Sequence, residues 1–547
     1  MYACPNCGAN IKFDPATQMM KCAYCDTQIA PFDYMHAKGA DEEKGIDLDS
    51  DEYYEVTYYT CPQCGGELIT EDTTAATFCS YCGASTILEM RVGKEKKPDY
   101  IIPFKKTRDD CVAAYKSTLA KAIFAPSELR KDETIERFRG IYMPYWIYDV
   151  DSNGKMISKG QVSSRRGDYI YTKHYTVEAD VETVYRGMSC DASSSFEDRL
   201  SEAIAPFDLK QSEHFTSSYF SGFYADTSDV KPELYNEDVK NLALSDAATE
   251  ISKNRIYRDH GVGQSEIITG LGNRRTTYRY KLGMFPVWFL SNQQGDRVSY
   301  AVVNGQTGKV AMDIPIDIKK FFLGTLILSI PIFLFLYFTG LLIGPRLLIM
   351  ITMIISIVVL VLANNQSNAL FAREILFDDK GYNSTRTPEQ IRETQQLIAG
   401  NVKVKKAKVK PRSGALGIGS AFAFSMIGFT LGNVMGIGPF LGIIIFVVVL
   451  VISIVSKKTV PKDKIIVKCP AGRKIGITIF PLISLTICAL IFLINPFQDT
   501  FYYGAAILGM VMTGFTVVRL VARHNELASR KLPQFNKRGG EEHETYR

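Results

Sequence analysis

The chain has 547 residues, of which 46% are hydrophobic, so it has room for several domains. Its formal net charge of +5 hides two opposite halves: residues 1–90 hold 15 acidic and 4 basic residues, whereas residues 319–547 hold 27 basic and 11 acidic ones. The first residues have neither the basic segment nor the apolar run of a cleavable signal peptide. Eight of the 12 cysteines form two tight groups, which suits metal sites in a reducing compartment better than a secreted disulfide framework.

The N-terminal 90 residues contain a duplicated cysteine motif. Each copy has two Cys-x-x-Cys pairs separated by 14 residues, and the second copy follows the first by 57 positions. Four thiolates complete a tetrahedral shell and leave no open position, so the motif predicts two structural zinc sites. A rubredoxin-like iron site and redox-active cysteine pairs are alternatives, but neither requires two identical sets of four. Because the loops are short, we expect one site at Cys4, Cys7, Cys22 and Cys25 and the other at Cys61, Cys64, Cys79 and Cys82.

We therefore predict a β zinc ribbon at residues 1–33, an acidic linker at 34–57 and a second β zinc ribbon at 58–90. Zinc ribbons often bind nucleic acid, which requires a surface rich in Lys and Arg. Residues 61–90 contain no Lys or Arg, and each zinc–thiolate centre adds about two negative charges. This acidic segment argues against nucleic acid as a partner and favours docking of proteins.

Residues 95–318 are predicted to form a mixed α+β domain. Helices are expected at 107–124, where Thr107 caps the start, from about Ser194, where Glu197 completes a capping box, and at 236–252. Strands are expected at 155–163, 169–186, 275–290 and 297–313, and a turn at Asn304–Gly308 divides the last of these into a hairpin.

The two tryptophans of the chain lie in matching contexts, Met143-Pro-Tyr-Trp146 and Phe285-Pro-Val-Trp288. A paired recognition surface is one interpretation. We favour the other, in which both are core strands, each Trp packs in the interior and each Pro marks the entry of a strand.

The sequence contains no recognisable catalytic constellation. Its six histidines are widely spaced, and neither HExxH nor GxSxG occurs. The segment Gly305-Gln-Thr-Gly-Lys309 lacks both the spacing and the Ser/Thr of a phosphate-binding loop. We therefore predict that the protein is not an enzyme and that zinc is its cofactor.

The C-terminal half is predicted to be an all-α bundle of six transmembrane helices. Apolar stretches at 321–343, 346–363, 415–435, 438–456, 475–494 and 501–522 approach or exceed the roughly 20 residues that cross a bilayer. They pair into three hairpins, at 321–363, 414–456 and 475–522. The cytosolic loop 364–413, the segment 457–474 and the tail 523–547 are basic, so the positive-inside rule places both termini in the cytosol, with the basic loops against anionic lipid.

The predicted hairpin 414–456 contains three GxxxG steps: two that overlap at Gly428, Gly432 and Gly436, and a third at Gly438 and Gly442. Such steps allow close helix packing within one chain or between copies in a homo-oligomer. No span has an ionisable residue away from its ends, which argues against a transporter. A glycine-rich broken helix lining a pore remains an alternative.

The assembled pattern resembles the bacterial membrane-anchored zinc-ribbon proteins of the YdjG-like group, often labelled TFIIB-type zinc-ribbon or primosomal-helicase-like proteins. The resemblance covers about residues 1–320 and rests on the CPxC…CxYC ribbons, Ile101-Ile-Pro-Phe104, the segment Phe138–Tyr148, Phe285-Pro-Val-Trp288 and Val303–Lys309. It implies a non-catalytic membrane platform that acts in envelope stress and helps to recruit a coat resembling phage shock protein A. The helicase label does not fit, because the chain lacks a Walker A motif and a basic duplex-binding surface.

Our leading hypothesis is an integral-membrane scaffold or adaptor of the bacterial cytoplasmic membrane that displays cytosolic docking domains. Two alternatives remain: a zinc-stabilised channel or transporter, and a membrane-tethered nucleic-acid-binding protein.

Overall fold

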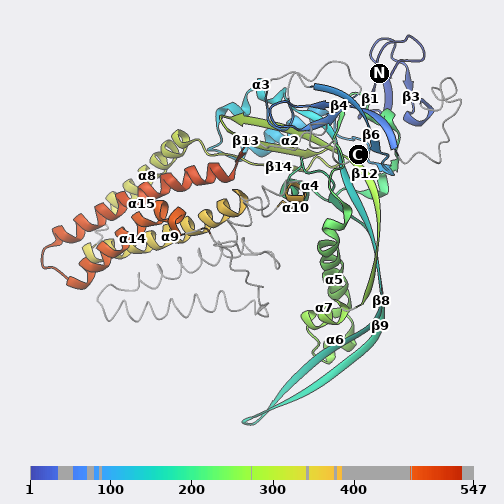
Figure 1. Cartoon of the computed structure of the whole chain (residues 1–547). Helices are drawn as coiled ribbons and strands as arrows, with labels where there is room; N and C mark the ends of the chain where they lie inside the picture. The colour runs from blue at the N-terminus through green and yellow to red at the C-terminus, as the bar shows by residue number, and fades with distance from the viewer. Residues whose placement is uncertain are drawn as a thin grey trace.

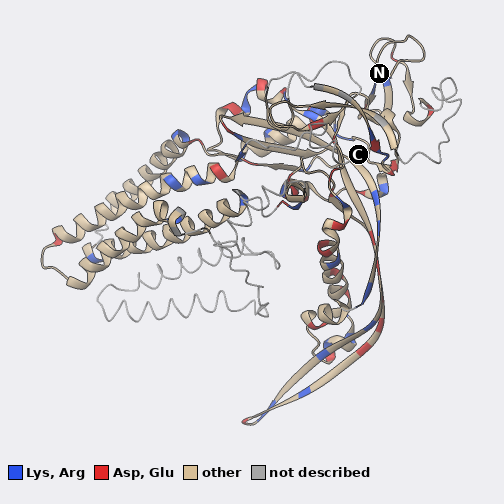
Figure 2. Ribbon diagram, viewed as in Figure 1, with Lys and Arg blue, Asp and Glu red and all other residues tan. Residues whose placement is uncertain are grey.

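The computed structural model describes residues 2–34, 53–70, 79–84, 89–272, 274–339, 344–374, 379–384, 469 and 471–531. Figure 1 shows a sheet-rich part, a group of long helices that extend from it to one side, and a long β-hairpin that leaves it in a second direction. Charged residues are spread over the sheet-rich part and the hairpin, whereas on the long helices they are confined to the end regions (Figure 2).

The centre of the fold is a 12-stranded sheet whose main path has the order β10-β7-β12-β8-β11-β5-β4-β6. Strands β13, β14, β15 and β9 join this path at its sides. The strands are β4 (Tyr53–Thr60), β5 (Glu67–Ile69), β6 (Glu89–Lys96), β7 (Tyr100–Ile101), β8 (Arg139–Arg166), β9 (Tyr169–Asp191), β10 (Glu213–His214), β11 (Tyr224–Ala225), β12 (Arg275–Gln294), β13 (Arg297–Asn304), β14 (Val310–Met312) and β15 (Arg530–Lys531).

The core lies where β8 and β12 cross the middle of the sheet. The two strands pair antiparallel from Arg139↔Phe289 to Asn153↔Arg275. Their central residues are buried on both faces, which is why these segments are continuously apolar rather than alternating. The predicted mixed domain is therefore present, and β13 and β14 form the hairpin expected on either side of Asn304–Gly308.

Both tryptophans are buried packing residues, as predicted. The indole of Trp146 on β8 donates to Val230 O at 2.7 Å, and that of Trp288 on β12 donates to Lys106 O at 3.0 Å. The prediction that the prolines mark strand entries is wrong, because Pro144 and Pro286 lie inside the strands. Pro144 faces Met284 in the β8–β12 ladder, and its carbonyl still accepts from Ala192 N at 2.8 Å.

The helices of the mixed domain mostly follow the sequence. Helix α2 (Arg108–Ala120) begins with the expected Thr107 cap, and α5 (Asn236–Ser252) has the predicted bounds. Helix α4 (Asp198–Ile204) begins after Glu197, later than predicted. The reason is that Ser194 does not cap it: its hydroxyl donates to Asp229 Oδ2 at 2.5 Å. The remaining elements are α3 (Asp132–Ile135), α6 (Arg255–Asp259), α7 (Gln264–Gly272), α10 (Lys380–Ser384) and the 3-10 helices η1 (Ser127–Arg130), η2 (Leu209–Gln211), η3 (Ser217–Phe220) and η4 (Pro232–Tyr235).

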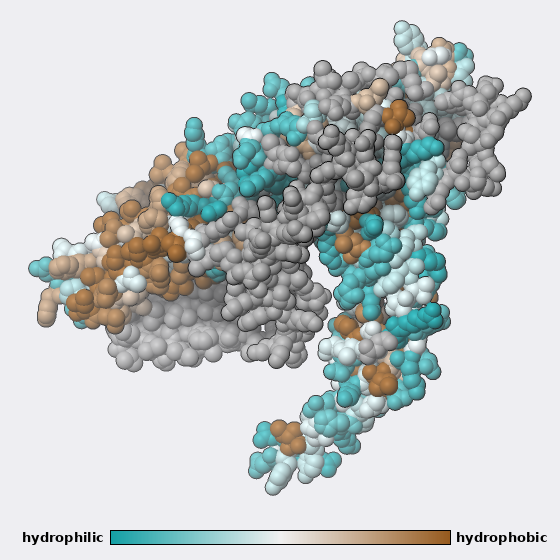
Figure 3. Space-filling view, in the orientation of Figure 1, coloured by the Kyte–Doolittle hydropathy of each residue, from teal (hydrophilic) through white to brown (hydrophobic). Residues whose placement is uncertain are grey.

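Four of the described helices are long and apolar enough to cross a membrane: α8 (Ile318–Thr339), α9 (Pro345–Glu374), α14 (Ala471–Ile494) and α15 (Asp499–Leu527). They contain the predicted stretches 346–363, 475–494 and 501–522 and residues 321–339 of the first predicted stretch, whose last four residues lie outside the described ones. Their surface is largely hydrophobic (Figure 3). The stretches 415–435 and 438–456 lie outside the described residues, so four spans, not a six-helix bundle, are supported.

Helices α9, α14 and α15 pack together through small residues and hydroxyls. The Ser356 and Ser484 hydroxyls lie 2.8 Å apart, and Ser484 donates to Gly509 O at 3.2 Å. A Cβ added to Gly509 would lie 2.8 Å from Thr352, so glycine allows this close approach. Ser356, Ser484 and Gly509 thus link the three helices through buried hydrogen bonds and close packing.

The helix group is joined directly to the sheet. Strand β15, just after α15, pairs with β13 at Arg297↔Lys531, and the Arg297 guanidinium donates to Glu526 O at 2.6 Å. At the end of α9, Arg373 contacts Asp313 at 3.1 Å and Glu197 at 3.5 Å. The apolar helices and the sheet thus share hydrogen bonds and ion pairs rather than only a linker.

Candidate metal centres

The first cysteine group is built by a small three-stranded sheet, β1 (Ile11–Asp14), β2 (Met19–Cys22) and β3 (Gln28–Ile29). Each cysteine pair sits on a tight turn: Gly8 N donates to Cys4 O at 2.8 Å, and Asp26 N donates to Cys22 O at 3.1 Å. Gly8 and Asp26 have φ angles of 73° and 53°. Glycine adopts this left-handed conformation without strain, and Asp tolerates it better than most residues.

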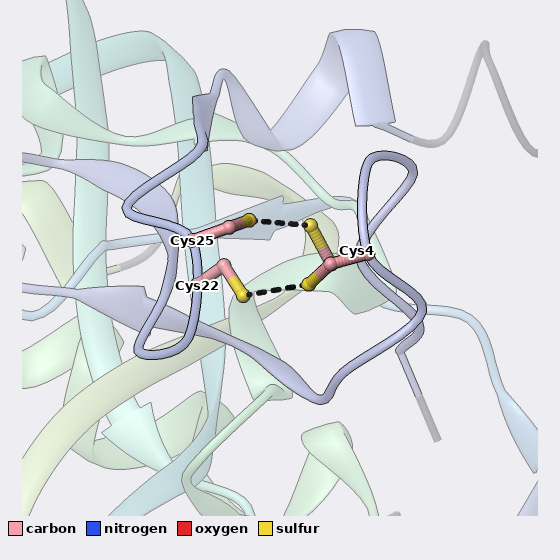
Figure 4. A group of neighbouring side chains, drawn as sticks. Cys4, Cys22 and Cys25 are labelled. Carbon is pink, nitrogen blue, oxygen red and sulfur yellow. Dashed lines mark hydrogen bonds between the residues drawn. The ribbon is translucent and has the colours of Figure 1, made fainter.

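These turns point four thiols at one another (Figure 4). The Sγ atoms of Cys4 and Cys25 are 3.6 Å apart, as are those of Cys7 and Cys22. All four lie within 4.8 Å of one another. The Thr27 hydroxyl, 3.0 Å from Cys25 Sγ, is the main cause that lowers the pKa of this thiol to about 6, which favours the thiolate that a metal binds.

The second group repeats this geometry in a more enclosed setting. The Sγ atoms of Cys61 and Cys82 are 3.8 Å apart, and those of Cys64 and Cys79 are 3.7 Å apart. Gly65 takes the position of Gly8, with a φ angle of 74°. In contrast to the first group, in which Cys7 is exposed, all four cysteines of the second group are buried.

The spacing of the thiols fits a tetrahedral metal. Four sulfur atoms placed about 2.3 Å from a central ion lie about 3.8 Å from one another. The four measured pairs fall between 3.6 and 3.8 Å, far longer than the roughly 2.05 Å of a disulfide. Each set of four can therefore hold one metal ion, in the grouping that the sequence predicts, and neither leaves a position for a substrate.

The first centre is attached to the sheet-rich part by aromatic packing and hydrogen bonds. The Phe13 and Tyr219 rings pack edge to face at 5.0 Å, and Phe13 N donates to Ser221 O at 3.1 Å. The Ser221 hydroxyl in turn donates to Ile11 O at 2.6 Å. The sequence offers no signal for this contact, because the two segments lie about 200 residues apart.

The second centre is part of the 12-stranded sheet itself. Its cysteines pack in one apolar cluster with Phe289 and Tyr300 of β12 and β13. The Tyr300 hydroxyl donates to Tyr81 O at 2.6 Å, within the second knuckle. Strand β6 also runs across residues 90–95, where the sequence suggests a domain boundary. The second ribbon is therefore continuous with the mixed domain.

Outside these two groups, no further set of three or more metal-ligating side chains is found in the part of the chain that the structure describes. The described histidines are scattered: His174 is exposed on β9, His214 packs on Tyr100, His260 packs on Tyr175, and His524 lies 3.3 Å from Ile314 O. His36 and His543 lie outside the described residues. The prediction that the protein is not an enzyme stays a prediction.

Comparison with known proteins gives one distant homologue. No family model matches the chain, and no solved structure matches it. Over 328 residues the chain is 27% identical to an uncharacterized protein of Bacillus subtilis named YdjG, an alignment that covers 58% of this chain and 91% of that protein. This similarity agrees with the resemblance drawn from the ribbon and Pro-x-Trp motifs, and it assigns no activity.

Proposed function

We propose that the protein is a membrane-anchored scaffold or adaptor in which two zinc ions hold the sheet-rich part in shape for docking of other proteins. The main observation behind this proposal is that both cysteine groups form closed sets of four thiols. The first packs against the 12-stranded sheet and the second is part of it, and the same sheet is joined to the apolar helices through β15. A closed cage stabilises a fold and leaves no site for a reacting molecule. Zinc is the favoured ion because four thiolates in a tetrahedron suit it and it has no redox chemistry.

An open strand of the sheet supports the docking role. Strand β6 ends the main path of the sheet and pairs only with β4 among the described strands. Its Met90 and Val92 side chains are exposed, at 67% and 68% of their surface. An open edge with apolar side chains on one face accepts an extended segment of another protein as an added strand.

The partner that we propose is a cytosolic or peripheral membrane protein, such as a coat protein resembling phage shock protein A in envelope stress. Two observations support this partner: the chain resembles the YdjG-like membrane-anchored zinc-ribbon proteins, and its first 90 residues are acidic, which disfavours binding of nucleic acid. In this proposal both termini lie in the cytosol of a bacterial cell, and the basic segments between the helices lie against the inner leaflet.

Proximity labelling in the native host tests the proposal, with the full-length chain fused to a labelling enzyme. We expect one or a few cytosolic or peripheral membrane proteins to be enriched, and the double variant Met90→Asp/Val92→Asp to lose them. The control is Ile123→Asp, which changes an equally exposed apolar residue away from β6. No enrichment by the native chain, together with solute flux through liposomes that contain the purified protein, would contradict a scaffold and favour a channel.

A further inference from the structure

The β8–β9 hairpin extends well beyond every other described element. Strand β12 accompanies β8 only as far as Asn153, and the last described backbone contacts outside the hairpin are at Gly160 and Gln161. The two strands continue to pair with each other up to Arg166↔Tyr169. At about 3.3 Å per residue, the free end projects roughly 20 Å past its last contact. Every side chain from residue 161 to 174 is exposed.

An unsupported two-stranded ribbon is marginally stable in water, because it has neither a second layer nor neighbours for its outer edges. The chain nevertheless closes this ribbon with a tight turn, in which Gly167 and Asp168 connect the paired residues Arg166 and Tyr169 and Gly167 has a φ angle of 62°. A projecting ribbon of this kind is expected to gain stability from a surface that it contacts.

The composition of the free end changes from that of the rest of the hairpin. Tyr169, Ile170 and Tyr171 are consecutive, and 72%, 72% and 56% of their surfaces are exposed. Basic residues surround them, since residues 161–174 contain Arg165, Arg166 and Lys173 and a single acid, Asp168. Closer to the sheet, β9 instead has three acids in alternation, Glu178, Asp180 and Glu182. The free end is therefore aromatic and basic, whereas the part nearer to the sheet has mixed charge, with Lys155 of β8 lying 3.3 Å from Glu178 of β9.

The hairpin and the apolar helices leave the sheet in different directions, but the end of the hairpin curves toward the side to which the helices run (Figure 1). In Figure 1 the helices α8, α9, α14 and α15 run to the left, and the hairpin runs downward and curves to the left as well. Figure 3 shows an apolar patch close to the end of the otherwise hydrophilic hairpin. The free end of the hairpin therefore turns toward the side to which the membrane-spanning helices extend.

We infer that residues 162–174, the hairpin tip, rest on the headgroup region of the bilayer that the helices cross, and that anionic phospholipid is their partner. Tyrosine places an apolar ring and a polar hydroxyl at a membrane–water interface, and Ile170 adds a short apolar contact. Arg165, Arg166 and Lys173 attract anionic headgroups. Because the helices already hold the chain in the membrane, the lipid is present at a high effective concentration near the hairpin tip, and the contact does not need to be strong.

The inference is tested with the full-length chain in lipid nanodiscs whose acyl chains carry bromine, a quencher of tryptophan fluorescence. Tyr171→Trp places a reporter at the hairpin tip. Val184→Trp is the matched control, since Val184 lies on the same strand nearer to the sheet and is 54% exposed. The native Trp146 and Trp288 are buried in the sheet, so the unsubstituted chain supplies the background to subtract.

We expect the Tyr171→Trp signal to lose emission in brominated phosphatidylglycerol nanodiscs while the Val184→Trp signal does not. High salt, or Arg165→Glu/Arg166→Glu in the reporter chain, is expected to reduce that loss. Ile170→Trp provides a second reporter if Tyr171→Trp lowers the yield of folded protein. Equal loss of emission from the Tyr171→Trp and Val184→Trp chains in every nanodisc would overturn the inference. A loss of Tyr171→Trp emission that depends on protein concentration rather than on the lipid would also overturn it, because it would indicate contact between copies of the chain.

Discussion

Cys7 and Cys64 occupy the same position in the two copies of the cysteine motif, yet their surroundings differ. Cys7 is exposed at the edge of the small sheet, whereas Cys64 lies in the apolar cluster of the main sheet. Loss of one ligand opens the metal cage in both cases, but only at Cys64 does it also disturb the main core. The consequences of the two substitutions should therefore differ in size.

We predict that Cys7→Ser and Cys64→Ser each reduce bound zinc from two ions per chain to one, as measured by mass spectrometry of the metal. Cys64→Ser should also lower the free energy of unfolding by at least about 4 kcal/mol, the stabilisation that a ligand provides at a thousandfold excess over its Kd. Cys7→Ser should cost less, because the small sheet keeps its contacts through Phe13 and Ser221. Equal losses of stability in thermal unfolding would argue against the core position of the second centre.

Asp226 is a buried carboxyl that makes the stability of the protein depend on pH. Burial raises its pKa to about 7, although the Ser193 hydroxyl donates to it at 2.5 Å. In the unfolded chain the pKa is about 3.9, so between about pH 4 and pH 7 the folded state holds a proton that the unfolded state has released. The contribution of Asp226 to stability is thus present below pH 4 and is lost as the pH rises to 7.

We predict that Asp226→Asn removes this dependence. The free energy of unfolding of the variant, minus that of the native chain, should increase from pH 5 to pH 8, by at most about 4 kcal/mol. Other titrating groups are the same in both proteins, so their contributions cancel in this difference. Thermal unfolding of both proteins in detergent, followed by tryptophan fluorescence at the two pH values, measures the difference. If the variant and the native chain differ in free energy of unfolding by the same amount at pH 5 and at pH 8, Asp226 does not titrate in this range.

At the scale of elements, the joint between α9 and the sheet depends on a small ion-pair network. Arg373 contacts Asp313 and Glu197, and Arg199 contacts the same two carboxylates at 2.7 and 3.4 Å. Burial by itself would raise the pKa of Glu197, but the charges of Arg373 and Arg199 outweigh it and the pKa is lowered. The network therefore favours the ionised form of Glu197 beside the end of a membrane-spanning helix.

A double-mutant cycle of Arg373→Gln and Asp313→Asn should give a coupling energy of about 1–3 kcal/mol, since both side chains are mostly buried, with 16% and 9% of their surface exposed. The control is the solvent-exposed pair Lys253–Glu250, for which about 0.5 kcal/mol or less is expected. The measurement is the free energy of unfolding of the full-length chain in detergent. A coupling no larger than that of the control would mean that the network does not hold the joint.

Local patterns predict elements where the determining residues are neighbours in sequence. The Thr107 cap with Asp110, the Asn304–Gly308 turn and the four-cysteine groups are of this kind, and all are present. Long-range contacts decide the cases that differ. Ser194 bonds to Asp229 instead of capping α4. Helix α9 continues past residue 363, where Asn364 accepts from Lys474 of α14 and Asn368 accepts from Cys469 N.

At the scale of the whole molecule, the sequence suggests two ribbons on an acidic head and a separate mixed domain. The structure instead continues the second ribbon into the sheet and packs the first ribbon against Tyr219 and Phe223. No local pattern reports this, because the packing joins residues about 200 positions apart. The metal centres, the sheet and the joint to the helices therefore form one connected framework, from which the proposed docking surface and the hairpin tip project.

The metal content of the purified full-length chain tests this account most directly. Native mass spectrometry should find two zinc ions per chain, and a strong chelator should remove them with a loss of cooperative thermal unfolding. A chain that contains no zinc and still unfolds cooperatively at the same temperature would contradict the central claim that eight thiolates hold the sheet-rich part in shape.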